Sequence, residues 1–79
     1  MYFQTMDIFS TIEPIIVKYK PKLLAVMDTL DESVTDEGLA KVAIELHKLL
    51  PFAVRMVVTQ NALTNVLIAN RARVQQLLA

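Results

Sequence analysis

The chain has 79 residues, a single glycine, no cysteine and a formal net charge of zero. This length allows one small domain. The lack of cysteine excludes disulfide scaffolds, thiolate metal sites and cysteine nucleophiles, and the balanced charge removes the simplest electrostatic reason to bind nucleic acid or anionic lipid.

Apolar content is high for so short a chain. Apolar residues make up 54% of the sequence, and the mean hydropathy is +0.44, whereas globular proteins average about 45–50% apolar residues. A domain of this size buries only about 60–65% of its unfolded surface. We therefore expect more apolar surface than one chain can cover, and we expect a partner to cover the surplus.

The first residues need a separate interpretation. Tyr2-Phe3-Gln4 resembles the end of the recognition sequence of a tobacco-virus protease that is used to remove purification tags. Residues 1–5 are therefore either a tag remnant or a native start, and a single helical domain is expected over 6–79. No export signal is recognisable and cysteine is absent, so we expect the protein in the cytoplasm.

Apolar residues recur at steps of three and four between residues 8 and 30, which predicts a first helix over 6–31. Ser10 and Glu13 have the spacing of a capping box, and a start near Ser10 would place Pro14 in the first turn, where proline is tolerated. Pro21 would remove a helical hydrogen bond, yet the apolar spacing keeps its phase across it. We predict one kinked helix, with a break into two short helices as the alternative.

A second helix is predicted over 36–50. Thr35 is a suitable N-cap residue, and two acidic residues follow it in the first turn, where the helix dipole favours negative charge. The residue before a proline avoids the helical conformation, so Pro51 predicts a tight corner after Leu50. A kinked continuous helix is the alternative.

The segment 52–78 contains no glycine or proline, which predicts a third helix of about 27 residues and roughly 40 Å. A compact domain of this length has a radius of gyration near ~12 Å and is roughly 30 Å across. The third helix would exceed that diameter. We expect either that its last turns fray or that its end packs on another chain.

An apolar seam along this third helix contains amide side chains and is our candidate interface. A buried amide is costly unless it is paired, and such a residue can fix the register or the oligomeric state. Gln60 and Asn70 either pair across a helix interface or mark the exposed edge of a wide stripe. The candidate interface residues are Gln60, Leu63, Leu67, Asn70, Val74 and Leu77.

The sequence predicts no catalytic, cofactor-binding or metal-binding site. Aligning Gly38 with the sixth position of a calcium loop places Ser33 first and Ile44 twelfth, and the required acidic ligands are missing at both ends. His47 is the only candidate general base near neutral pH, and it lacks a nucleophile or a second metal ligand at a useful spacing. We expect no enzyme activity, no cofactor and no metal.

Charge is unevenly distributed. Residues 1–40 carry a net charge of −4 and residues 41–79 a net charge of +4. These halves either attract each other within one fold or match acid to base between chains. Two small basic clusters are a weak footprint for nucleic acid, and their members are Lys18, Lys20, Lys22, Arg71 and Arg73.

The sequence thus predicts an all-α fold, either a three-helix bundle or an elongated helical hairpin with a kinked first helix. We expect a non-enzymatic protein–protein interaction or assembly module. Its partner would be itself, in a homo-oligomer such as a dimer, or a larger protein. The less favoured alternatives are a small regulatory nucleic-acid-binding protein and a peripheral membrane-associated module.

Overall fold

The computed structural model describes residues 5–27 and 35–79, with side chains from residue 8 onward in the first range. Every element in these ranges is an α-helix, which confirms the all-α fold. The acidic connection between the first two predicted helices, and most of the predicted tag remnant, lie largely outside the described residues. The helices are α1 (Thr5–Lys18), α2 (Lys20–Ala25), α3 (Asp36–Leu49), α4 (Phe52–Val57), α5 (Gln60–Ala69) and α6 (Arg71–Leu78).

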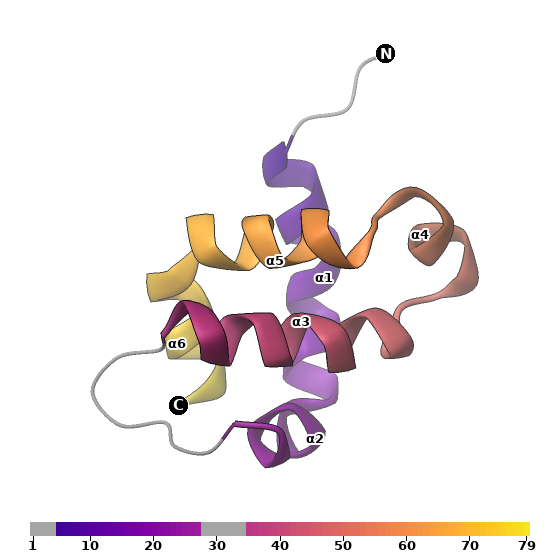
Figure 1. The fold of residues 1–79 in the computed structure, drawn as a ribbon. Helices are drawn as coiled ribbons and strands as arrows, with labels where there is room; N and C mark the ends of the chain where they lie inside the picture. The colour runs from indigo at the N-terminus through magenta and orange to yellow at the C-terminus, as the bar shows by residue number, and fades with distance from the viewer. Residues whose placement is uncertain (1–4, 28–34) are drawn as a thin grey trace.

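Helices α3 and α5 form the centre of the fold. They run side by side in opposite directions and make the most extensive helix–helix contact (Figure 1). Helix α1 crosses behind this pair and contacts α5 and α6, while α2 contacts α3 and α6. Helix α4 lies at the end where α3 is connected to α5, and it makes no extensive contact with another described helix.

One hydrophobic core joins α1, α2, α3, α5 and α6. None of the residues of α4 is buried, and no polar or charged residue in the described part of the chain is buried. Full burial of a leucine or isoleucine side chain stabilises a fold by about 1.5–3 kcal/mol. The largest fully buried side chains are Ile12, Ile16, Leu23, Leu39, Val42, Leu46, Leu63, Leu67, Val74 and Leu78.

The first predicted helix is divided at Tyr19. Its backbone angles are φ −106° and ψ 23°, outside the helical region, and α2 begins at the next residue. Pro21 lies in the first turn of α2, where its missing N–H has no helical partner to lose. The alternative of two short helices is therefore the correct one.

The predicted capping box at Ser10 is wrong. Helix α1 already begins at Thr5, so Ser10 lies inside it and Pro14 is in its interior instead of its first turn. The carboxylate of Glu13 does not cap the helix but pairs with Arg73 of α6. Glu13 therefore pairs with a residue 60 positions away in the chain and not with the backbone near Ser10, and sequence spacing does not reveal such a contact.

Helix α3 begins and ends as predicted. The Oγ1 of Thr35 accepts a hydrogen bond from the N–H of Gly38 at 3.0 Å, which confirms the N-cap. Leu50, with φ −69° and ψ 147°, is extended and buried, which confirms the corner before Pro51. The chain therefore leaves α3 sharply, and the residues after the corner form a separate helix.

The prediction of one continuous helix over 52–78 is wrong. Val58 is extended, and Thr59 starts α5 as an N-cap whose Oγ1 accepts a hydrogen bond from the N–H of Ala62 at 3.0 Å. A second break follows at Asn70, whose Nδ2 donates to the carbonyl oxygen of Val66 at 2.8 Å. The radius of gyration is 11.7 Å, that of a compact domain. The reason to expect a helix end outside the fold therefore disappears.

Replacing Thr59 with alanine tests the unpredicted start of α5. The Ala62 N–H would lose its acceptor, so we expect the free energy of unfolding to fall by about 1 kcal/mol. Thr59→Ser keeps the hydroxyl oxygen and should stay close to the wild type. Chemical denaturation measures both variants, and equal stability of Thr59→Ala and the wild type would contradict the cap.

Candidate interaction surface

The exposed apolar surface of the described residues is concentrated on α4. Phe52, Met56 and Val57 are 70%, 69% and 75% exposed. The other large apolar side chains that are exposed in the described ranges are Val17 at 55% and Ile44 at 45%, on α1 and α3. We call Phe52, Met56 and Val57 the α4 patch.

The local sequence explains why this patch stays in water. Helix α4 is only six residues long, because the corner at Pro51 precedes it and the cap at Thr59 follows it closely. Helical residues four apart share one face, so Phe52 and Met56 project together. Only Val54 among the α4 residues is half-buried and packs against the core. A helix this short cannot turn all its apolar side chains inward.

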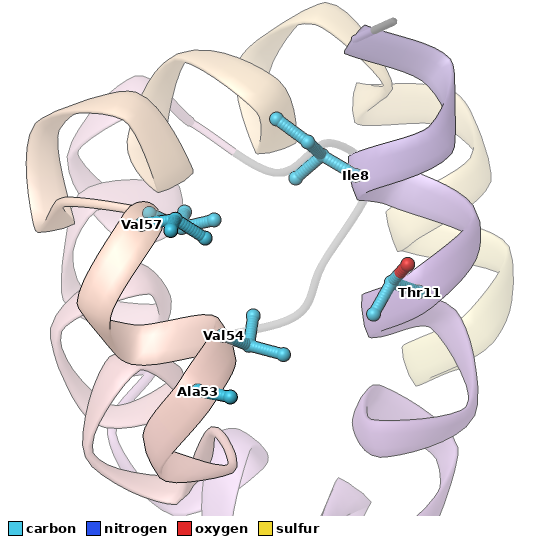
Figure 2. A pocket seen from close by; sticks show the side chains of 6 residues that line it. Ile8, Thr11, Ala53, Val54 and Val57 are labelled. Carbon is cyan, nitrogen blue, oxygen red and sulfur yellow. The ribbon is translucent and has the colours of Figure 1, made fainter. Parts of the chain in front are cut away.

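A pocket of about 190 Å³ lies beside the patch, between α1 and α4. Figure 2 shows the side chains of Ile8, Val54 and Val57 directed into the space between the two helices. Val57 belongs to both the pocket wall and the α4 patch, so the two form one continuous apolar surface. The lining residues are Ile8, Thr11, Ala53, Val54, Val57 and Val58.

The predicted interface residues lie on α5, on α6 and at the break between them, and none belongs to the α4 patch. Leu63, Leu67 and Val74 are fully buried in the core of their own chain, and Leu77 is half-buried against that core. The same spacing of apolar residues suits a core and an interface, and in this fold it serves the core. Three of these four side chains leave no surface for a second chain.

The two amides of the predicted seam lie at opposite ends of α5. Gln60 is exposed in the first turn, and Asn70 is half-buried after the last turn, where its amide bonds to the carbonyl oxygen of Val66. They are too far apart along the helix to pair with each other within one chain. The side chain of Asn70 is instead hydrogen-bonded to the backbone of α5, the helix that it ends.

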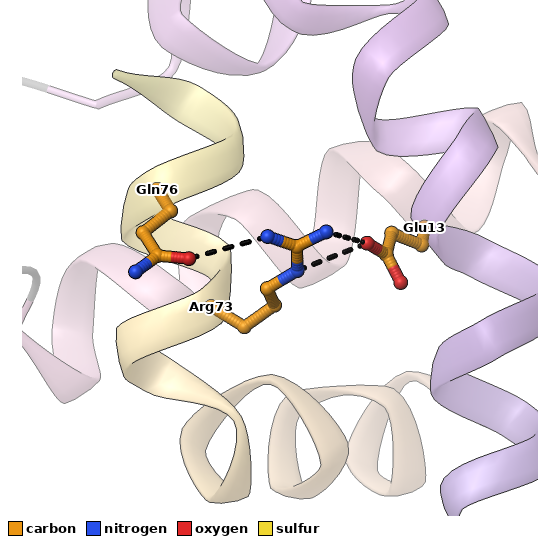
Figure 3. Close-up of polar contacts among 3 residues, drawn as sticks. All are labelled: Glu13, Arg73 and Gln76. Atoms are coloured by element: carbon orange, nitrogen blue, oxygen red, sulfur yellow. Dashed lines mark hydrogen bonds and ion pairs between the residues drawn. The ribbon is translucent and has the colours of Figure 1, made fainter.

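Two arginines in the first turn of α6 form ion pairs between the basic half of the chain, residues 41–79, and the acidic half, residues 1–40. Arg73 donates to Oε2 of Glu13 from Nη2 at 2.5 Å and from Nε at 3.0 Å, and its Nη1 donates to Oε1 of Gln76 at 3.2 Å (Figure 3). Arg71 forms an ion pair with Asp36 of α3. These pairs agree with the interpretation that the charged halves attract each other within one fold.

The lysines of the other predicted basic cluster lie around Tyr19. Lys18 and Lys22 place Nζ 5.4 Å and 5.7 Å from the centroid of its ring. The Nζ of Lys20 donates to the backbone oxygen of Ala79, the last residue of the sequence. Three of the five basic residues considered for nucleic acid are therefore engaged with carboxylate or backbone oxygens of this chain.

His47 makes a structural contact. It is half-buried in the last turn of α3, and its Nε2 lies 2.8 Å from the carbonyl oxygen of Val58. Because a carbonyl oxygen can only accept, Nε2–H donates this bond. It holds α3 to the first of the two residues that separate α4 from α5. Within residues 5–27 and 35–79, no group of three or more His, Cys, Asp or Glu side chains could hold a metal ion.

Among the helices that the structure describes, none combines the length and the apolar character needed to cross a bilayer.

Replacing Glu13 with glutamine tests how much the pair with Arg73 contributes. Since Arg73 is half-exposed, we expect the free energy of unfolding to fall by less than about 1 kcal/mol. The difference from the wild type should shrink as sodium chloride is added. Glu45→Gln is the matched control, because Glu45 forms a longer pair with Lys48, at 3.9 Å, within one helix. A larger loss that salt does not change would contradict an exposed ion pair.

Comparison with known proteins identifies no relative, because no family model matches the chain and no similarity to a curated protein or a solved structure is significant. The α4 patch and the pocket beside it are the features of the described residues that point to an interaction.

Proposed function

We propose that this chain is a non-enzymatic assembly module that associates with a second copy of itself through the α4 patch. The observation that carries the proposal is the exposure of Phe52, Met56 and Val57 beside a core that is complete without them. Contiguous apolar surface on an otherwise closed fold commonly marks a protein contact site.

The size of the patch sets the expected affinity. Covering side chains that are about 70% exposed gains about 1–2 kcal/mol each, so six of them in a dimer gain roughly 6–12 kcal/mol. Association itself costs about 4–15 kcal/mol in lost freedom of motion. These opposing amounts leave a net gain of at most about 8 kcal/mol, so the dimer is weak, with a Kd that is micromolar at its tightest.

A second copy is preferred to a different protein because the patch can be self-complementary. In a two-fold symmetric dimer the same surface serves on both sides, and the assembly is closed at two chains. Arg55 is the only charged residue of α4, and it is exposed. It can stay in water at the rim of such a contact, so no buried charge opposes dimer formation.

The alternatives have less support. Binding of nucleic acid would compete with the ion pairs of Arg71 and Arg73 and with the contact of Lys20 to the chain end. Attachment to a membrane surface would depend on Phe52, Met56 and Val57, three side chains of a helix of only six residues. The cytoplasmic location stays a prediction from the sequence.

Met56→Gln tests the proposed function. Glutamine matches methionine in length and helix propensity, so the fold should be kept. Each copy would lose about 1 kcal/mol of apolar contact, so we expect the Kd of self-association to rise about 30-fold. Light scattering or sedimentation over a series of protein concentrations measures it.

Val17→Thr is the matched control, because it removes an exposed apolar side chain on a different helix. We expect its self-association to equal that of the wild type. A wild-type chain that stays monomeric at millimolar concentration, or a Val17→Thr variant as weak as Met56→Gln, would contradict a dimer formed through α4.

A further inference from the structure

We propose that the pocket between α1 and α4 receives the Phe52 ring of a second copy, so that two chains exchange rings in a two-fold symmetric contact. This inference rests on the proposed self-association and adds the group that fills the pocket. It is carried by three features of the described residues, which are the size of the pocket, the direction of Phe52 and the arrangement of side chains around α4.

The pocket matches an aromatic ring in size and chemistry. Its volume is about 190 Å³, and five of the six described residues that line it are apolar, with Thr11 as the exception. An apolar cavity of about 150 Å³ is large enough to bind benzene. The phenyl group of a phenylalanine therefore fits, and its entry would cover the side chains of Ile8, Val54 and Val57 that Figure 2 shows facing the space.

The chain's own Phe52 does not fill this pocket. It is not among the lining residues, and its side chain is 70% exposed. At about 100° per residue, Phe52 projects roughly 200° away from Val54, which faces the pocket. Among the residues whose side chains are described, Phe52 is the only exposed aromatic, since Phe9 is buried and Tyr19 half-buried. Helix α4 thus carries an exposed aromatic ring on one side and forms a wall of the open pocket on the other.

The arrangement around α4 allows a reciprocal contact. The five apolar residues of the helix span an arc of about 200°, from Phe52 past Val57 to Val54, and Arg55 lies in the remaining arc. The apolar surface is continuous from the projecting ring to the pocket mouth. When the α4 helices of two copies meet across a two-fold axis, each ring reaches the other copy's pocket, and both contacts form together.

Two variants remove opposite halves of this contact. Phe52→Ala removes the ring and leaves the pocket open. Ala53→Leu fills the pocket from its own wall and keeps the ring. Both residues are exposed in the single chain, so both variants should fold, which circular dichroism checks. With about a tenfold loss for each ring, we expect each variant to self-associate about 100-fold more weakly than the wild type.

Ala53→Leu separates ring exchange from simple apolar attraction. Leucine enlarges the apolar surface of α4, so association driven by area alone would become tighter. Ring exchange predicts the opposite, because the partner's ring no longer finds space. An Ala53→Leu variant that associates as tightly as the wild type would overturn the ring exchange and leave dimer formation through the α4 patch in place.

Mixing the two variants gives a stricter test. A mixed dimer restores one contact, between the ring of Ala53→Leu and the open pocket of Phe52→Ala. We expect the mixed dimer to form about tenfold more tightly than either variant pairs with itself. No gain on mixing would overturn the reciprocal contact.

A measurement on the wild type needs no variant. In a mixture of isotope-labelled and unlabelled chains, nuclear Overhauser effects between chains should connect the ring protons of Phe52 to the methyl groups of Ile8. A dimer without this effect would overturn the ring exchange alone. A wild-type chain that stays monomeric would overturn both the exchange and the proposed function.

Discussion

The antiparallel contact between α3 and α5 is the interaction on which the rest of the structure depends. Leu39 and Leu46 from one helix and Leu63 and Leu67 from the other have no exposed surface, and α1 crosses behind the pair. To bring α5 back along α3, the chain must reverse direction within the short connection 50–59. Helix α4 lies within that connection. It lies beyond the end of the core, where there is little left to pack against.

The exposed patch follows from this position and not from a general excess of apolar residues. Outside α4, the leucines of the described residues are buried or half-buried, and the two exposed large apolar side chains in these ranges, Val17 and Ile44, lie on different helices. Three large apolar side chains remain in water at one end of the molecule. Such an arrangement persists at a free-energy cost that a second molecule can recover. The proposed dimer and ring exchange both depend on this local consequence of the chain reversal.

Sequence reasoning predicted the elements that local chemistry determines. The hydroxyl of Thr35 caps α3 by accepting a hydrogen bond from the nearby backbone. The ring of Pro51 ends α3 because it disfavours a helical conformation at Leu50. The breaks at Thr59 and Asn70 were missed, since threonine and asparagine also occur inside helices. The burial of Leu63, Leu67 and Val74 within their own chain could not be predicted for a similar reason. The seam through Leu63 and Leu67 has the same spacing whether it faces a core or a partner.

Oxidation of methionine by hydroxyl radicals, followed by mass spectrometry, tests the central claim most directly, because it reports exposure at single side chains. Met56 is 69% exposed and Met27, at 8%, serves as the buried reference in the same chain. The account predicts that Met56 oxidises much faster than Met27 in dilute solution and becomes protected as the protein concentration rises. Equal rates for the two methionines in dilute solution, or a rate for Met56 that never changes with concentration, would contradict it.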